Sequence, residues 1–108
     1  MIKLNNLIKV SCEQFHNKNQ FIVRYYERKP APRVSTDFVA FQSYKTLIAI
    51  FCPNTHIIYV NWSKCDYSKT TMKHLKMFIN EETCYQYDNK MQFLHFLKTN
   101  KEVILFEE

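Results

Sequence analysis

The most regular pattern of apolar and polar positions lies in residues 39–62. Residues 47–52 are almost all apolar, a polar turn follows at residues 53–55, and residues 57–60 are again apolar and rich in β-branched side chains. Two such runs joined by a short turn are typical of a β-hairpin. The first run is apolar at consecutive positions, as in a strand that is covered on both faces or lies at the centre of a sheet. The pattern therefore predicts a central hairpin around which the rest of the chain folds.

Apolar runs on either side of this hairpin predict further strands. Residues 7–12 and 20–28 form a candidate pair, which the polar segment 13–19 would join. Residues 38–41 lead into the hairpin, and residues 102–106 form a short candidate strand near the end of the chain. Successive strands joined by short connections pair most simply as neighbours. We therefore expect an antiparallel sheet whose strands are contiguous in sequence.

Two amphipathic helices are predicted in the C-terminal half. In the first, at about residues 68–82, apolar side chains recur every three or four positions and lysines occupy another face. Ser68 or Asp66 is a suitable N-cap for it. The second, at about residues 89–99, carries a stripe of methionine, leucine and phenylalanine, with Asp88 as its expected N-cap.

Together these elements predict one α+β domain over residues 1–108. An antiparallel sheet of about four to five strands, at about residues 7–62, would pack against the two C-terminal helices. A chain of 108 residues has room for one core, and a hydrophobic content of 46% is too high for intrinsic disorder. No apolar run approaches the roughly 20 residues of a spanning helix, and the first residues lack the apolar core of a signal peptide. We expect a cytoplasmic protein that contacts no membrane.

Glycine is absent from the chain. Without it, no Gly-rich loop can bring backbone amides against a phosphate group, which excludes Walker-type and dinucleotide-binding fingerprints. The turns must also use other residues, and we expect positive φ angles mainly at asparagine and aspartate. The candidate positions are Asn17, Asn19, Asn54, Asn61, Asp88, Asn89 and Asn100.

The cysteines and histidines do not form a recognisable metal site. Cys12 and Cys52 fall within predicted strands, where a free thiol packs as a small hydrophobic side chain, and no C-x-x-C pair is present. A zinc site can be drawn, but its spacing matches no finger or ribbon. Its ligands would be Cys52, His56, Cys65 and His74. We expect reduced cysteines, no metal and no cofactor.

No catalytic constellation stands out either. Asp66 and Asp88 precede predicted helices and are explained as caps, while His74 and His95 lie on helix flanks, where surface or boundary positions are usual. Catalysis requires a nucleophile with a base, paired carboxylates or a metal cluster, and the sequence places none of these together. We predict that the protein is not an enzyme. An enzyme whose site the sequence does not reveal is a further alternative.

Binding is better supported than catalysis, because the net charge of +5 is concentrated in two places. Arginines surround the proline-containing segment 29–33, lysines follow the first predicted helix, and aromatic residues such as Tyr25, Tyr44 and Trp62 are interleaved with them. Such surfaces are typical of nucleic-acid binding, and arginine with tyrosine is equally typical of protein interfaces. The alternative is an ordinary solvated helix face with tyrosines capping the core. The candidate partner-binding residues are Arg24, Tyr26, Arg28, Arg33, Lys69, Lys73 and Lys76.

Two motifs carry a family resemblance. Residues 41–49 read FQSYKTLIA, residues 66–81 read DYSKTTMKHLKMFINE, and the predicted hairpin lies between them. In these segments the chain resembles small proteins of unknown function carried by bacteriophages and mobile elements of low-GC Gram-positive bacteria. The resemblance implies a phage accessory protein, and small proteins of that kind commonly bind and disable a host factor. Anti-CRISPR proteins are one prominent group among them. The resemblance implies no catalytic residues.

The first functional hypothesis is therefore a non-catalytic phage inhibitor of a host defence protein, most specifically an anti-CRISPR that acts on a CRISPR effector nuclease. A basic chain does not suit DNA mimicry, which needs carboxylates in a phosphate-like array. It would instead bind an acidic face of the nuclease or also contact the guide RNA. The alternative is a basic nucleic-acid-binding accessory protein that uses the same surface. The sequence leaves the oligomeric state open.

Overall fold

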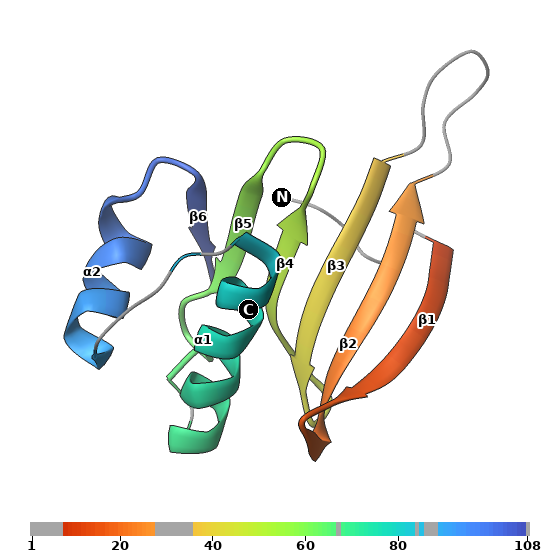
Figure 1. The fold of residues 1–108 in the computed structure, drawn as a ribbon, viewed down its shortest axis with the longest axis horizontal. Coiled ribbons are helices and arrows are strands. Elements are labelled where there is room, and N and C mark those ends of the chain that lie inside the picture. Colours follow the sequence, from red (N-terminus) through yellow and green to blue (C-terminus); the bar gives the residue numbers. More distant parts are fainter. Residues whose placement is uncertain (1–7, 28–35, 67, 84, 86–88, 108) are drawn as a thin grey trace.

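The computed structural model describes residues 8–27, 36–66, 68–83, 85 and 89–107. Five strands are followed by two helices and a final strand (Figure 1). These elements are β1 (Ile8–Phe15), β2 (Asn17–Glu27), β3 (Thr36–Ser43), β4 (Thr46–Cys52), β5 (Ile57–Asn61), α1 (Lys69–Thr83), α2 (Lys90–Thr99) and β6 (Val103–Phe106). The prediction of an α+β domain with two C-terminal helices is confirmed.

The strands form one sheet in the order β1-β2-β3-β4-β5-β6. The first five strands pair antiparallel, as predicted, but β6 pairs parallel to β5. The sheet thus has six strands rather than four to five, and the expectation of a purely antiparallel sheet is wrong for its last strand. Parallel neighbours need a long crossover, and α1 with α2 provides one. The apolar pattern of residues 102–106 predicted a strand but carried no information on its direction.

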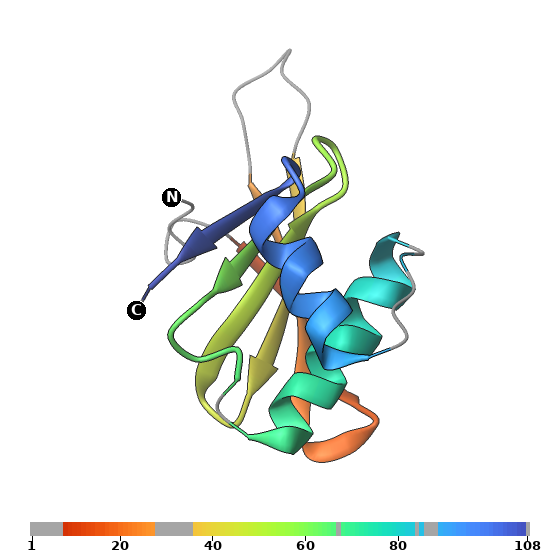
Figure 2. The ribbon, with the colours of Figure 1, turned by 90° about the vertical axis from the view of Figure 1, so that its left-hand side faces the viewer.

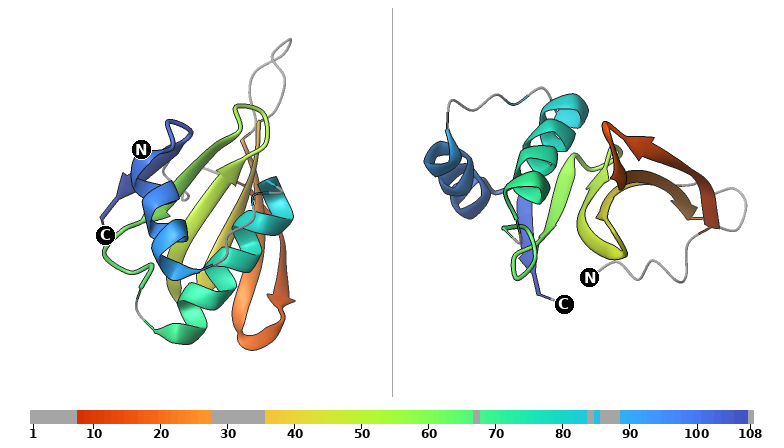
Figure 3. Two further views of the ribbon diagram at one scale, coloured as in Figure 1. Left: turned by 60° about the vertical axis from the view of Figure 1, so that its left-hand side comes forward. Right: turned by 90° about the horizontal axis from the view of Figure 1, so that it is seen from below.

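Both helices lie on the same face of the sheet (Figures 2 and 3). The main core fills the space between the helices and the sheet. It includes Phe41 of β3 and Phe78 of α1, whose rings stack with centroids 5.8 Å apart. A second, smaller cluster lies on the opposite face and includes Ile50 and Cys52 of β4. Because side chains alternate along a strand, β4 contributes to both clusters, and Phe51 belongs to the first. The prediction that residues 47–52 form a central strand buried on both faces is confirmed.

The turns differ most from the predictions. Residues 13–19 were expected to be a polar connection, but β1 and β2 extend through most of this segment and meet at His16. Among the described residues, positive φ angles occur at His16 (60°), Tyr44 (54°) and His56 (59°), not at asparagine or aspartate. The geometry of each tight turn determines φ at that position, whatever the side chain. Cys12 was expected to be buried, yet it is exposed, because β1 is an edge strand.

The helix starts are capped by side chains. Ser68 Oγ accepts a hydrogen bond from the Thr71 amide at 3.1 Å, which confirms Ser68 as the N-cap of α1. Asn89 Oδ1 accepts from the Gln92 amide at 2.9 Å at the start of α2. The predicted cap Asp88 lies outside the described residues. Neither of the two described helices has the length and apolar content that crossing a membrane requires.

Candidate functional site

The two sequence motifs, residues 41–49 and 66–81, meet through a chain of hydroxyl groups at one end of the sheet. The β3 strand ends at Ser43, and Ser43 Oγ lies 3.1 Å from Thr71 Oγ1 on the first turn of α1. Ser68 Oγ donates to the same Thr71 oxygen at 3.1 Å. Ser43 and Thr71 are both buried. This network fixes the start of α1 against the β3–β4 turn.

Tyr44 occupies the first position of that two-residue turn. Its φ of 54° lies in the left-handed region, where the first residue of such a hairpin turn is usually glycine. The Tyr44 amide donates to Asn19 O at 2.7 Å, and Gln42 Nε2 donates to Tyr44 O at 2.7 Å. Left-handed backbone at a bulky residue costs about 1–3 kcal/mol, which these two hydrogen bonds help to offset. The Tyr44 residue as a whole remains 56% exposed.

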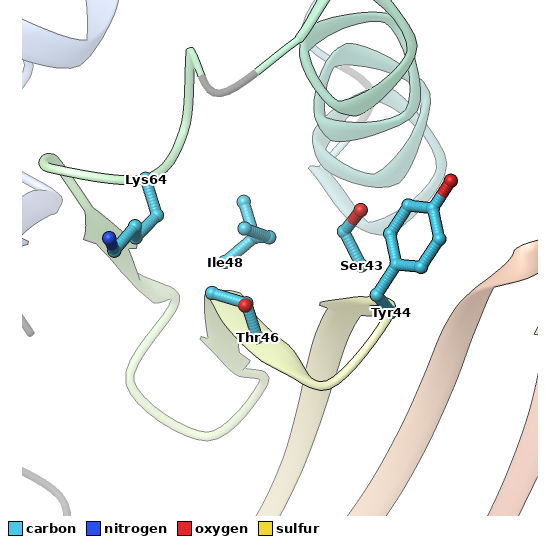
Figure 4. Close-up of a pocket in the computed structure, with 5 residues that line it drawn as sticks. All are labelled: Ser43, Tyr44, Thr46, Ile48 and Lys64. Atoms are coloured by element: carbon cyan, nitrogen blue, oxygen red, sulfur yellow. The ribbon is translucent and has the colours of Figure 1, made fainter.

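A small cavity opens between Tyr44 and the connection from β5 to α1 (Figure 4). Its volume is about 110 Å³. Tyr44 stands on one side of it, Lys64 on the opposite side, and the buried Ile48 lies between them. Ser43 and Thr46 complete the lining. We call this cavity the Tyr44 pocket.

A larger groove of about 240 Å³ lies beside α1 and reaches the start of α2. We call it the lysine groove. Its lining is defined by four lysines, one aspartate and one methionine: Lys69, Lys73, Lys76, Lys90, Asp66 and Met72. The groove therefore carries four ammonium groups against one carboxylate.

The charges in the lysine groove are poorly compensated. Asp66 Oδ2 is 2.9 Å from Lys90 Nζ, and both side chains are about half exposed, so this pair is weak. No other ion pair to a groove lysine occurs within the described part of the chain. Both helices begin at this end of the molecule, and their N-termini add partial positive charge (Figure 1). The groove is thus a site of positive potential suited to phosphate groups.

The structure separates the predicted arginine site from the predicted lysine site. Arg24 and Tyr26 of β2 line a different pocket, of about 210 Å³, on the part of the sheet formed by β1, β2 and β3. We call it the Arg24 pocket, and it is lined by Val10, Arg24, Tyr25, Tyr26, Asp37, Phe38 and Val39. The other two predicted arginines, Arg28 and Arg33, lie outside the described residues, as does the proline-containing segment around them.

The charge of the Arg24 pocket is balanced. Asp37 lines the pocket with Arg24, and Glu82 of α1 lies within electrostatic reach. Burial raises the pKa of Glu82 above the usual 4.5 and Glu81 adds to the rise, whereas the Arg24 guanidinium lowers it. Arg24 therefore has carboxylates of its own chain nearby.

The candidate zinc ligands and catalytic groups do not assemble. His74 is buried rather than at the surface as predicted, and its Nδ1 lies 2.7 Å from Thr70 O. His56 Nδ1 pairs with Glu102 at 2.8 Å. Burial and the nearby Asp66 raise the pKa of the Cys65 thiol, so it is mostly protonated at neutral pH. Across the residues described, no three His, Cys, Asp or Glu side chains lie close enough together to hold a metal ion.

Two contributors to this end of the molecule were not among the predicted site residues. Lys90 enters the groove from α2, and only the packing of the two helices brings it there. Tyr44 was recognised as one of the interleaved aromatics, but the pattern did not show that its turn lies beside the start of α1. The combination of a tyrosine with a two-residue turn in a chain that lacks glycine is the signal that could have identified it.

Comparisons with known proteins give one result. A family model described as a family of unknown function (DUF8033) matches residues 3–94. No curated protein and no solved structure matches the chain significantly. The match covers both motifs and β1 to β5, and it extends into α2.

Proposed function

The chain belongs to the family of unknown function DUF8033, and we propose that it is a non-catalytic protein that binds nucleic acid through phosphate groups held in the lysine groove. One observation carries this proposal: four lysines from two helices converge on one groove, and among the described residues that line it Asp66 is the one carboxylate. Lysine binds phosphate as a point charge and tolerates many geometries. Such a groove suits a repeating phosphate backbone, and binding there involves no chemical reaction.

The arrangement distinguishes the groove from an ordinary solvated helix face. On such a face, lysines alternate with carboxylates at i+3 or i+4 and form weak pairs. Here Lys69, Lys73 and Lys76 follow one side of α1 at steps of four and three residues with no acidic residue between them. Repulsion among them destabilises the free protein slightly, and a bound polyanion would remove it.

The proposal is tested with a variant and a matched control. The groove-reversal variant carries Lys69→Glu, Lys73→Glu and Lys76→Glu. The matched control carries Lys9→Glu, Lys18→Glu and Lys101→Glu, three exposed lysines outside the groove, and it has the same net charge. Affinity for a fluorescein-labelled single strand of about 20 nucleotides is measured by anisotropy at low salt.

Groove reversal should lower the affinity by about 100-fold or more, because attractive phosphate contacts become repulsive. The matched control should lose about 10-fold at most, through the long-range field alone. Equal losses in the two variants would contradict the proposal, as would a wild-type protein that binds neither DNA nor RNA.

A second function is favoured by the Arg24 pocket. We propose as the alternative a phage accessory protein that inhibits a host defence protein, with a CRISPR effector nuclease as the most specific target. Arg24 is exposed beside the partly buried Tyr25 and Tyr26, and Val10 is 64% exposed. Arginine and tyrosine around an apolar centre are the usual anchors of a protein interface.

This alternative is tested by cleavage of a plasmid target by a purified CRISPR effector nuclease with its guide RNA. The wild-type protein should slow cleavage, and a variant with Arg24→Glu and Tyr26→Ala should not. The groove-reversal variant separates the two functions, since inhibition through the Arg24 pocket should survive it. Unchanged cleavage in the presence of excess wild-type protein would contradict the alternative for that nuclease.

A further inference from the structure

We infer that the Tyr44 pocket binds one unstacked base of a single-stranded nucleic acid, next to the phosphates held in the lysine groove. This inference rests on the proposed nucleic-acid binding and adds to it the type of strand and the residue that contacts a base. It assigns to Tyr44 the role of a stacking platform and to Lys64 that of a cation on the opposite side of the pocket.

The size of the pocket limits what can occupy it. Sites for drug-sized ligands and cofactors have volumes of about 300–1,000 Å³, well above the 110 Å³ of the Tyr44 pocket. A cavity of about 150 Å³ holds a single benzene ring. The Tyr44 pocket is smaller than that but partly open to solvent, so it fits the face and one edge of a single flat ring.

The lining suits a base better than a purely apolar or purely charged group. Ile48 is 1% exposed and provides an apolar floor, while Thr46 is exposed at the rim and offers a hydroxyl group. Tyr44 offers an aromatic face, and every base has a π-face that can stack on such a ring. Lys64 is exposed and can reach either a base acceptor or the adjacent phosphate.

The backbone at Tyr44 supports a role for its ring. A positive φ at the first position of a two-residue turn is met by glycine without cost, yet a large aromatic residue stands there. The turn is held by hydrogen bonds at both the amide and the carbonyl of Tyr44, so the exposed ring projects from a fixed base. Fixed aromatic side chains bind with a small loss of conformational entropy.

The pocket and the groove are close enough for one strand to occupy both. Lys64 lines the Tyr44 pocket and Asp66 lines the lysine groove, and both belong to the same connection between β5 and α1. Two residues of extended chain span at most about 7 Å, so the two linings are separated by no more than one or two nucleotides. In a duplex the base faces are covered by stacking, which leaves only a single strand able to fill the Tyr44 pocket.

The test compares three fluorescein-labelled probes: a 12-nucleotide oligothymidylate, a 12-nucleotide abasic strand with the same phosphates, and the duplex of oligothymidylate with oligodeoxyadenylate. The wild-type protein should bind oligothymidylate about 10-fold more tightly than the abasic strand, the range expected for one stacked base. Tyr44→Gly should remove this preference, because it removes the ring while suiting the positive φ of the turn. Tyr44→Phe should keep it.

The outcomes distinguish the two proposals. If the wild-type protein binds oligothymidylate and the abasic strand equally, and Tyr44→Gly changes neither affinity, the proposed role of the Tyr44 pocket in binding a base is contradicted. Phosphate binding in the lysine groove is then still supported. If the wild-type protein binds none of the probes, the proposed binding of nucleic acid is contradicted, and base binding in the Tyr44 pocket is contradicted with it. The groove-reversal variant should bind both single strands more weakly while keeping their ratio, which separates the contribution of the phosphates from that of the base. Tighter binding of the duplex than of the single strand would also overturn the inference.

Discussion

The lysine groove and the Arg24 pocket are similar in size, yet they differ in charge balance. The groove has a volume of about 240 Å³ and contains four lysines with one aspartate. The Arg24 pocket has a volume of about 210 Å³ and is lined by one arginine and by Asp37, and Glu82 lies within electrostatic reach of the arginine. In the groove, Asp66 pairs with Lys90 alone, which leaves three of the four lysines without an ion pair among the described residues, whereas the single Arg24 has two carboxylates nearby. Charge compensation within the fold, more than the number of cations, distinguishes a surface suited to a polyanion.

The two surfaces also differ in how they are built. The lysine groove lies on helices whose starts are fixed by Ser68 and Asn89, so its ammonium groups extend from rigid backbone. The Arg24 pocket lies on β1 to β3 near the sheet edge, with the aromatic side chains of Tyr25 and Tyr26 beside the charge. The lysine groove suits phosphate contacts, which do not depend on the nucleotide sequence. The Arg24 pocket suits a protein partner whose surface is complementary to it in shape.

The largest expected effect comes from giving the groove the charge balance of the Arg24 pocket. Lys73→Glu combined with Lys76→Glu places two carboxylates opposite the remaining lysines. Affinity for a single strand should fall by about 30-fold, whereas Arg24→Glu should lower it by less than about 3-fold. Anisotropy titrations at equal salt measure both. A larger loss of affinity for Arg24→Glu than for the double variant would contradict the conclusion that the lysine groove, and not the Arg24 pocket, binds the strand.

The next effect tests the cap that supports the groove. Ser68→Ala removes the N-cap of α1 and its hydroxyl bond to Thr71. The free energy of unfolding should fall by about 1 kcal/mol, and the melting temperature by about 4 °C, which thermal denaturation followed by circular dichroism would show. Ser68→Asp, which keeps a capping oxygen, should restore most of the loss. Unchanged stability of the alanine variant would show that the hydroxyl chain does not fix the helix start.

A smaller effect should follow from removing the carboxylate of Asp66 from the groove. Asp66→Asn releases Lys90 from its ion pair and raises the positive potential of the groove. Affinity for the single strand should increase by about 3-fold at low salt, and the gain should disappear at about 1 M salt, where screening is strong. A decrease in affinity would mean that the pair positions Lys90 for binding and does not compete with it.

The smallest effect belongs to the Arg24 region and depends on pH. Because the pKa of Glu82 is raised in the folded protein, the folded state binds its proton more tightly than the unfolded state. Folding stability therefore decreases as the pH rises from about 4.5 through the raised pKa. Glu82→Gln should stabilise the protein at pH 7 by less than about 0.5 kcal/mol and leave it unchanged near pH 3. Urea denaturation at the two pH values measures this, and a larger gain at pH 3 would contradict the sign.

Local patterns predicted the elements well, because each depends on near neighbours. The apolar run of residues 47–52 predicted a strand buried on both faces, and the serine before Lys69 predicted the start of α1. The direction of β6 could not be predicted, since it follows from how α1 and α2 return the chain. The positive φ angles at His16, Tyr44 and His56 were also missed, because hairpin register sets them.

The candidate site was predictable only in part. Lys69, Lys73 and Lys76 share a helix face, so sequence spacing alone grouped them correctly, and the structure places them in one groove. Arg24 and Tyr26 line a different pocket, and their proximity in sequence to other cations did not show which carboxylates of the fold would lie near them. Lys90 joins the groove through helix packing, which no local pattern encodes.

The central claim is that the lysine groove binds the phosphates of a nucleic acid, and the salt dependence of single-strand affinity tests it most directly. For about three to four phosphate contacts, the logarithm of the association constant should fall linearly with the logarithm of salt concentration, with a slope of about −2 to −3. The slope should approach zero in the groove-reversal variant and be retained in the matched control. A wild-type affinity that does not depend on salt, or an equal slope in the groove-reversal variant, would contradict the account.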